Sequence, residues 1–281
     1  MLRVAFITGA AAGAAFPGAA ADRPAALERR VGGRLGVFAL DTASGATLAH
    51  RADERFPMCS TFKVLAVSTV LARVDAGREH LDRRIAYGPG ELLSYAPQTR
   101  RNVRRGWMTV AELCSAALVW SDNTAANLLT AAAGGPPAVT RYARSLDDRL
   151  TRLDRYEPAM SSSIPGDRRD TTTPRAMVRD WQRLLCGDAL SRASRSLLEG
   201  ALVACRTGDE RIRAGLPHAW RAGDKTGSGA HGTSNDVAIL WPPKRAPIVV
   251  AAYLTGATAG EDARNAVLAA VGRLVVAHFT N

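Results

Sequence analysis

The chain has 281 residues, of which 47% are hydrophobic and 22% are charged, and its formal net charge is +11 at pH 7. This size and apolar content exclude a disordered or low-complexity chain and suffice for one large domain or two interlocked ones. The positive charge does not indicate a nucleic-acid partner, because the arginines are scattered and no basic run alternates with aromatic residues. We interpret it as a solvated, arginine-rich surface.

Residues 1–21 resemble an export signal. Arg3 gives a short basic region, an apolar stretch follows, and Ala19-Ala20-Ala21 offers a cleavage site of the A-x-A type. The alternative is a membrane anchor, but Pro17 and the many Ala and Gly residues make this stretch too weakly hydrophobic for a span. We therefore expect a secreted or periplasmic protein with no stable membrane association after cleavage.

Strand patterns occur at both ends of the remaining chain and helical patterns between them. Residues 34–51 are typical of a hairpin with a turn at Ser44-Gly45. Helices are predicted at 60–74, 109–120, 123–133, 173–187 and 191–205. Thr109 and Glu112 form a capping box, and Thr173-Pro174 is a typical helix start. Strands are predicted within 218–227, 232–242 and 247–256, before a last helix at 261–278.

The order of these elements predicts an α/β fold of the α+β type. One antiparallel five-stranded sheet would be built from residues 22–56 and 207–281, with flanking helices. An all-helical part, residues 57–206, would be inserted between the two halves of the sheet. We expect the active site in the cleft between the sheet and the helical part.

Cysteine and histidine give no metal signature. The four cysteines include no C-x-x-C pair, and the five histidines lack ligand spacing, so we expect neither a metal nor another cofactor. An exported protein can hold disulfides, and a pairing of Cys186 with Cys205 stays open. Cys59, in an apolar stretch, is expected to be a buried free thiol.

Only three of the 37 basic residues other than histidine are lysines: Lys63, Lys225 and Lys244. Lysine, unlike arginine, can lose its proton when it is desolvated and then act as a base. Ser60 lies three residues before Lys63, on one face of a predicted helix start, so a neutral amine could take the proton of the serine hydroxyl. An S-x-x-K spacing is common by chance, however, and no histidine is placed for a Ser-His-Asp triad.

Two further short motifs are weak by themselves. Ser121-Asp122-Asn123 interrupts two helices, where such residues often only cap. Lys225-Thr226-Gly227 ends a strand and could supply a charge for an anionic substrate, although an exposed edge lysine is the simpler interpretation. The G-x-G-x-x-G at 227–232 precedes a strand instead of a helix, so we reject it as a dinucleotide site.

Residues 152–170, "RLDRYEPAMSSSIPGDRRD", fit no regular element. Long irregular loops in compact domains are usually functional or disordered. Arg155 and Asp170 could form an ion pair that fixes the ends of the loop. The alternative is a mobile surface loop.

Together, S-x-x-K, S-D-N and K-T-G in this order are a strong signal, and the sequence resembles the class A serine β-lactamases over nearly the whole mature chain. The most specific piece is "RLDRYEPAMSSSIPGDRRDTTTP", which resembles the omega loop of that family. Penicillin-binding peptidases share the short motifs but not this loop.

The resemblance implies a set of catalytic roles. Ser60 would be the nucleophile that opens the β-lactam amide, activated by Lys63 and Glu157, of which either could be the acylation base. Ser121 would pass a proton to the leaving nitrogen. The backbone N–H groups of Ser60 and Ser228 would form the oxyanion hole. Glu157 would then activate the water that hydrolyses the acyl-enzyme.

The resemblance also implies how the substrate is held. Asn123 would bind the amide of the substrate's side chain. Lys225, Thr226 and Ser228 would hold the substrate's carboxylate, and Tyr95 would line the mouth of the cleft. The expected partners are therefore small β-lactam molecules.

The sequence departs from the family at three places. Ser161 stands where an asparagine usually helps to hold the deacylating water. Ser234 stands where many members carry a second cation after K-T-G, and Arg211 resembles a residue that substitutes for that cation in some members. Cys114 matches one half of a disulfide found in some members, but Val67 stands at the other half.

Two alternatives to a β-lactamase stay open. A penicillin-binding D,D-peptidase would share Ser60, Lys63 and Lys225 but should lack a deacylating glutamate, so Glu157 argues against it. A β-lactam sensor would be acylated without turning over, and Ser161 is the feature that leaves room for it. The preference among penicillins, cephalosporins and carbapenems is not readable from the sequence, and a monomer is expected.

Overall fold

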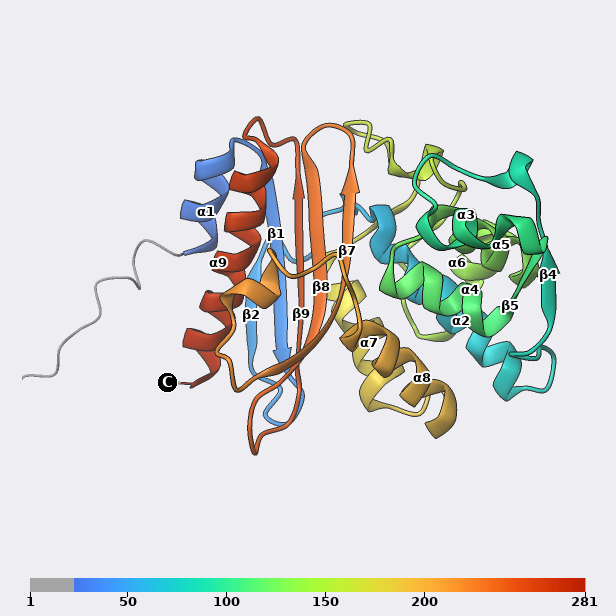
Figure 1. Ribbon diagram of the computed structural model, residues 1–281. Helices are drawn as coiled ribbons and strands as arrows, with labels where there is room; N and C mark the ends of the chain where they lie inside the picture. The colour runs from blue at the N-terminus through green and yellow to red at the C-terminus, as the bar shows by residue number, and fades with distance from the viewer. Residues whose placement is uncertain (1–22, 281) are drawn as a thin grey trace, which may run out of the picture.

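The computed structural model describes residues 23–280, so the expected export signal lies outside the described residues. One antiparallel sheet of five strands, in the order β2-β1-β9-β8-β7, joins both ends of the chain (Figure 1). Its strands are β1 (Arg34–Asp41), β2 (Thr47–His50), β7 (Arg221–Gly229), β8 (Thr233–Trp241) and β9 (Ile248–Thr255). The predicted fold class is therefore confirmed.

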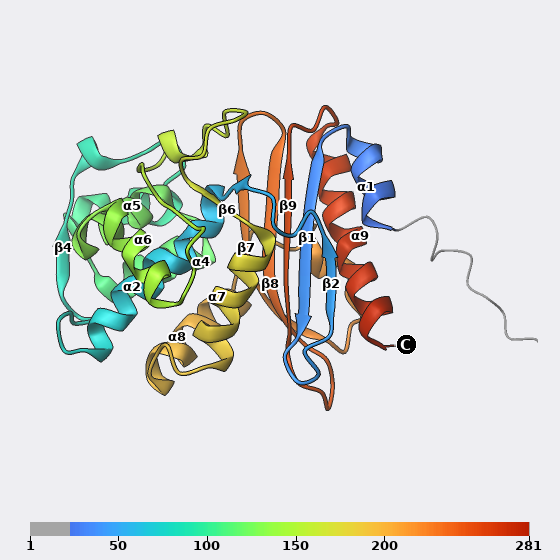
Figure 2. The ribbon, with the colours of Figure 1, turned by 180° about the vertical axis from the view of Figure 1, so that it is seen from behind.

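Helices cover both faces of this sheet. Helices α1 (Pro24–Val31) and α9 (Glu261–Thr280) pack on one face, and α7 (Pro174–Cys186) packs on the other (Figures 1 and 2). Alternate residues of one strand point to opposite faces. In β1, Val37 and Ala39 join the core under α1 and α9, whereas Phe38 joins the core on the opposite face.

The helical part lies beside the β7 edge of the sheet (Figure 1). Its helices are α2 (Lys63–Asp75), α3 (Pro97–Asn102), α4 (Val110–Val119), α5 (Asn123–Ala133) and α6 (Pro136–Ser145). Helix α2 packs against α4, α5, α6 and α8 (Arg192–Val203), and its residues 63–71 are all buried. A helix that is apolar all round is expected at the centre of such a bundle.

Two small strand pairs complete the structure. Strand β3 (Phe56–Pro57) pairs with β6 (Thr171–Thr172), and β4 (Arg84–Ala86) pairs with β5 (Trp107–Thr109). The first pair joins the segment before Ser60 to the end of the 152–170 loop. The loop and the nucleophile candidate are thus tied together by backbone pairing.

Local signals predicted most of the helices. Thr109 caps α4 and Thr173 caps α7, as expected. Three helices were missed, α1, α3 and α6. Helices α1 and α3 lack a side-chain cap, and α6 begins with two prolines directly after Gly134-Gly135, a combination that is typical of a turn.

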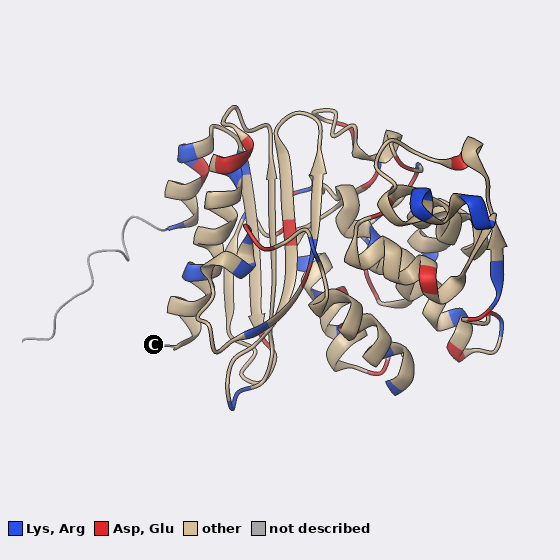
Figure 3. Ribbon diagram, in the orientation of Figure 1, with Lys and Arg blue, Asp and Glu red and all other residues tan. Residues whose placement is uncertain are grey.

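Charged residues do not gather on one element. Lysine and arginine occur on the sheet, on the helical part and on the loops between them (Figure 3). Within residues 23–280 no helix is long and apolar enough to cross a membrane. The same residues contain no group of three or more His, Cys, Asp or Glu side chains that could hold a metal ion.

Candidate active site

A cavity of about 410 Å³ lies between the β7 edge of the sheet, the helical part and the 152–170 loop. Its lining residues are Ser60, Tyr95, Ser121, Asn123, Glu157, Pro158, Ser161, Thr207, Arg211, Thr226, Ser228 and Glu261. The structure therefore brings the predicted site residues to one place, except Arg155 and Asp170. Lys63 and Lys225 do not line the cavity but are fully buried and bonded to Ser121 behind it.

Ser60 lies in a short 3₁₀ turn, Cys59–Phe62, that leads into α2. The helix prediction from residue 60 was therefore early by one turn, since the α-helix begins at Lys63. Gly227 of β7 lies so close to this turn that an added Cβ would be 2.8 Å from the carbonyl oxygen of Met58. Glycine in the K-T-G motif thus lets the strand approach the nucleophile candidate.

The Ser60 hydroxyl donates a hydrogen bond to Glu157 Oε1 at 3.3 Å. The resemblance implied that Glu157 and Lys63 both activate this hydroxyl, and the direct contact is the one with Glu157. Lys63 Nζ donates to the Ser121 carbonyl oxygen at 2.7 Å and to Asn123 Oδ1 at 2.5 Å, and it lies 3.7 Å from Glu157 Oε1. Glu157 is therefore the group that links the hydroxyl to the amine.

Burial lowers the pKa of Lys63 to about 7. The nearby Glu157 carboxylate opposes this change, and the positive charge of Lys225 adds to it. A lysine in water has a pKa of about 10.4, so the neutral amine is far more accessible here. The structure thus supports the interpretation that lysine at this position can exchange a proton.

Ser121 connects the two buried lysines. It lies between α4 and α5 with a positive φ of 56°, and its hydroxyl accepts from Lys63 Nζ at 3.2 Å and from Lys225 Nζ at 3.0 Å. Its neighbour Asp122 is fully buried and caps α5 by accepting from Ala125 N at 2.9 Å. The S-D-N motif therefore contains both a site residue and a structural cap.

The other end of the cavity carries positive charge. Arg211 is buried and donates from Nη2 to Ser228 Oγ at 2.8 Å and from Nη1 to the Gly227 carbonyl oxygen at 3.0 Å. Lys225 lies one layer deeper, and burial lowers its pKa. Arg211 thus lies where the sequence predicted a substitute for the missing second cation.

Ser234, which stands where that cation was expected, is itself bonded to an arginine. Its hydroxyl accepts from Arg264 Nε of α9 at 3.0 Å. One residue on, Asn265 Oδ1 accepts from Arg211 Nε at 3.1 Å. The first turn of α9 therefore supports this end of the cavity.

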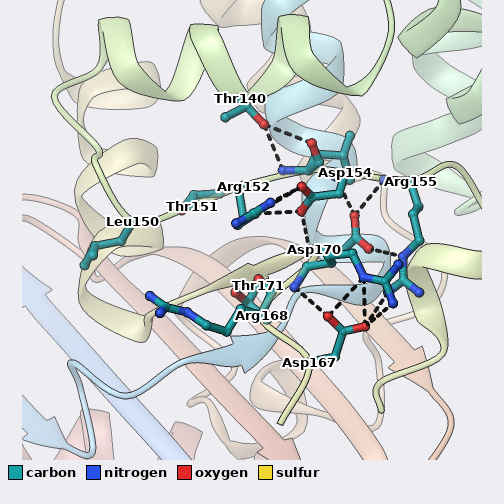
Figure 4. A network of polar contacts seen from close by, with 12 residues as sticks. Thr140, Leu150, Thr151, Arg152, Asp154, Arg155, Asp167, Arg168, Asp170 and Thr171 are labelled. Atoms are coloured by element: carbon teal, nitrogen blue, oxygen red, sulfur yellow. Dashed lines mark hydrogen bonds and ion pairs between the residues drawn. The ribbon is translucent and has the colours of Figure 1, made fainter. Parts of the chain in front are cut away.

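The 152–170 loop is closed by the predicted pair (Figure 4). Arg155 Nε donates to Asp170 Oδ2 at 2.6 Å, while Asp170 Oδ1 accepts from the backbone of Asp154 at 2.7 Å and of Arg155 at 3.0 Å. Asp170 is only 1% exposed. A buried carboxylate with three donors fixes the two ends of the loop to each other and favours an ordered loop over the mobile-loop alternative.

Glu157 is positioned from two sides. Asn127 of α5 donates to its carbonyl oxygen at 2.8 Å and accepts from its N–H at 3.0 Å. Ser161 Oγ donates to Glu157 Oε2 at 2.8 Å. The glutamate is 4% exposed, and the peptide bond to Pro158 is cis. One carboxylate oxygen thus faces Ser60 and the other faces Ser161.

The arrangement is suited to acyl transfer. A hydroxyl, a buried carboxylate and an amine of lowered pKa form one connected group, and cations lie at the end where an anion would bind.

A comparison with known families agrees with this chemistry, because the model of the beta-lactamase enzyme family matches residues 19–279. The chain belongs to the beta-lactamase enzyme family.

Individual relatives support the assignment. The chain is 51% identical to beta-lactamase AST-1 of Nocardia asteroides over 254 residues, covering 90% of this chain and 82% of the relative. It is 50% identical to beta-lactamase L2 of Stenotrophomonas maltophilia over 251 residues, covering 89% and 82%. A solved ancestral class A beta-lactamase has a TM-score of 0.89 and 61% identity, covering 91% of this chain and 98% of that one. The predicted resemblance to class A enzymes is confirmed.

Sequence reasoning missed several residues of this β-lactamase site. Asn127 follows Asn123 by one helical turn, a spacing that places both on one face of α5 and could have indicated it. Thr207 shares a hydrogen bond of 2.6 Å with Thr226 across the cavity wall. Arg264 and Glu261 gave no signal, because their nearness to the site depends on how α9 packs.

The cysteines of this β-lactamase are all free in the described residues. Cys186 is exposed whereas Cys205 is buried, so the disulfide that the sequence left open is not formed. Cys59 is fully buried, as expected, and burial raises the pKa of its thiol to about 12. Cys114 is also buried and unpaired.

Proposed function

We propose that this chain hydrolyses the amide of β-lactam antibiotics through an ester on Ser60, and that this turnover gives antibiotic resistance. The observation that carries the proposal is the Ser60 hydroxyl bonded to the buried Glu157, which in turn is held by Asn127 and Ser161. A deacylating base must be rigidly placed beside the ester that it serves. Glu157 meets this condition.

In the acylation step, Ser60 Oγ attacks the lactam carbonyl carbon and its proton passes to Glu157 or to neutral Lys63. The backbone N–H groups of Ser60 and Ser228 stabilise the oxyanion. Collapse of the tetrahedral intermediate breaks the C–N bond. The nitrogen then receives a proton from the Ser121 hydroxyl, and Lys63, which contacts Ser121 Oγ, passes on to it the proton that Ser60 gave up. Lys225 contacts the same hydroxyl.

In the deacylation step, Glu157 removes a proton from a water molecule, whose oxygen attacks the ester carbon. The C–O bond to Ser60 breaks, and Ser60 Oγ regains a proton from Glu157, the one that the carboxylate took from the water. The Ser161 hydroxyl already donates to Glu157 Oε2, so it orients the carboxylate and remains an acceptor for the water.

Substrate groups have distinct partners. Lys63 donates to Asn123 Oδ1, so the Nδ2 of Asn123 is left to donate to the carbonyl of the substrate's side-chain amide. Thr226, Ser228 and Arg211 bind the carboxylate, with Lys225 behind them. Tyr95, 49% exposed at the rim, forms a wall of the entrance.

The 152–170 loop serves as the omega loop that carries Glu157. Residues 1–21 direct export and are removed, so the enzyme acts in the periplasm or outside the cell. This location fits the activity, because β-lactams meet their targets there. Support comes from the basic and apolar composition of residues 1–21.

The deciding experiment concerns Glu157. The Glu157→Ala variant and wild type are mixed briefly with benzylpenicillin and examined by intact-protein mass spectrometry. General-base help is worth about 10²- to 10⁴-fold, so the variant should keep the mass of protein plus drug far longer than wild type. A Ser60→Ala variant, as control, should show no adduct.

Other results would contradict the proposal. Normal turnover by Glu157→Ala would mean that the hydrolytic base lies elsewhere. A long-lived adduct in wild type would favour the sensor or the D,D-peptidase. Turnover of a chromogenic cephalosporin by wild type separates the β-lactamase from both.

A further inference from the structure

Glu261 is a carboxylate at the rim of the cavity to which the mechanism above assigns no role. It is the first residue of α9 and lines the cavity together with Arg211 and Ser228. Residues three and four positions apart on a helix share one face. Arg264 and Asn265, at these spacings, are bonded to Ser234 and Arg211, so the face that carries Glu261 is turned toward this end of the cavity.

The charge of Glu261 is not neutralised locally. Within residues 23–280 its side chain has no hydrogen bond or ion pair, and it is exposed. Arg211, by contrast, is buried and makes four hydrogen bonds, to Asn265, Gly227, Asn235 and Ser228. The cavity thus has a cation in its floor and an anion at its rim, at the same end.

This arrangement matches the charges of one kind of substrate. In a cephalosporin the carbon that bears the carboxylate adjoins the carbon that bears the C3 substituent. If Arg211, Thr226 and Ser228 hold the carboxylate, the C3 substituent extends from the neighbouring carbon toward the rim. An opposite charge there would be attracted, and a second negative charge would be repelled.

We propose that Glu261 is a specificity-determining residue that favours β-lactams with a cationic substituent beside their carboxylate. The inference rests on the proposed function, since it assumes that the carboxylate binds at Arg211 and Ser228. Because Glu261 is exposed, it gives a modest, salt-sensitive preference for such substrates. Turnover itself does not require Glu261.

The test compares two cephalosporins with the same thienylacetyl side chain. Cephaloridine carries a pyridinium at C3, and cephalothin carries a neutral acetoxymethyl group. The measured quantity is the ratio of their kcat/KM values at low salt, for wild type, Glu261→Gln and Asp262→Asn. Asp262 is the matched control, because it is the next acidic residue of the same helical turn, is also exposed, and does not line the cavity.

We expect Glu261→Gln to lower the ratio by about two- to fivefold, the size of an exposed ion pair, and Asp262→Asn to leave it unchanged. The two substrates differ by one unit of net charge, so salt can change the ratio in every variant, and the quantity that isolates Glu261 is the difference between the ratios of wild type and Glu261→Gln. Raising the salt should shrink this difference. A purely structural role would change both substrates equally.

Three outcomes would overturn the inference: an unchanged ratio in Glu261→Gln, an equal change in Asp262→Asn, or a difference between wild type and Glu261→Gln that does not shrink as the salt is raised. Failure of the proposed function is distinct, because wild type would then hydrolyse neither cephalosporin. A changed ratio in an enzyme that turns over both supports both proposals.

Discussion

Two lysines in an arginine-rich chain occupy the most deeply buried cationic positions of the site. Lys63 and Lys225 are both fully buried and both donate to the Ser121 hydroxyl, whereas the third lysine, Lys244, is exposed. Arginine keeps its charge at any pH at which the protein is folded. At position 63 the chain therefore carries the basic residue whose proton can leave.

This interpretation predicts that Lys63→Arg is nearly as damaging as Lys63→Ala. Arginine retains the charge beside Glu157 but cannot become neutral near pH 7, where the pKa of Lys63 lies. We expect both variants to lose about 10²-fold or more in the acylation rate constant, measured by stopped-flow with benzylpenicillin.

Lys244→Arg is the matched control, since that lysine is exposed and distant in sequence from every site residue. It should acylate at the wild-type rate. Fast acylation by Lys63→Arg would mean that Lys63 acts only as a fixed cation and that Glu157 alone is the base.

At the scale of elements, α7 carries an unusual buried acid. Asp180 is fully buried, and the group that acts on its carboxyl most strongly is another buried acid, Asp148. It lines a second cavity, of about 250 Å³, together with Asp148, whose Oδ1 holds the start of the 152–170 loop by accepting from Leu150 and Thr151. Burial, and next the charge of Asp148, raise the pKa of Asp180 well above its usual value.

A raised pKa means that folded Asp180 keeps a proton that the unfolded chain releases above about pH 4. Below about pH 4 both states hold the proton, and Asp180 then contributes its full share to the free energy of unfolding. As the pH rises above about 4 this contribution decreases, by up to about 1.4 kcal/mol per pH unit. Asp180→Asn needs no proton. We expect the melting temperature of this variant to match wild type near pH 4 and to exceed it increasingly as the pH rises above about 5, until the pKa of folded Asp180 is passed.

The comparison is made by thermal unfolding at several pH values. Asp147→Asn serves as control, because Asp147 is exposed on the same stretch and pairs only with Arg183 at the surface. A difference between Asp180→Asn and wild type that does not vary with pH would contradict a buried, protonated carboxyl.

Elements that depend on local signals were predictable, and contacts that depend on distant packing were not. The capping box could be predicted because Thr109 and Glu112 lie in the first turn of one helix. The ion pair of Arg155 with Asp170 could be predicted because both residues belong to one loop. The residues alone related Ser60 to Lys63, three positions away, and only the resemblance to the family added Glu157, which the fold brings to the hydroxyl from 97 residues away. Glu261 reaches the site only through the packing of α9.

At the scale of the molecule, the sheet and the helical part share one hydrophobic core. Phe38 and Tyr253 of the sheet belong to the same buried cluster as Leu113 and Leu129 of the helical part. Neither part can separate without exposing that surface to water. The cleft is therefore a groove on one cooperative unit, although the chain crosses between the two parts.

Whether the sheet and the helical part unfold as one unit can be tested with the free thiols, because these lie in different elements. Cys114 is in α4, Cys59 precedes α2, and Cys205 follows α8; all three are buried, whereas Cys186 is exposed. Only thiolates react, and desolvation raises the pKa of all four thiols, so what sets Cys186 apart is its exposure to the reagent. A thiol reagent should label Cys186 quickly and the other three only when the protein opens.

If the shared core makes unfolding cooperative, Cys59, Cys114 and Cys205 should show equal free energies of opening, since each requires the same global event. The measurement is labelling over time with a slow alkylating reagent at several low urea concentrations, located by peptide mass spectrometry. Urea should accelerate all three with the same slope, because that slope scales with the surface exposed in opening. Faster labelling of Cys114, with a smaller slope, would show that the helical part opens by itself and would contradict a single cooperative unit.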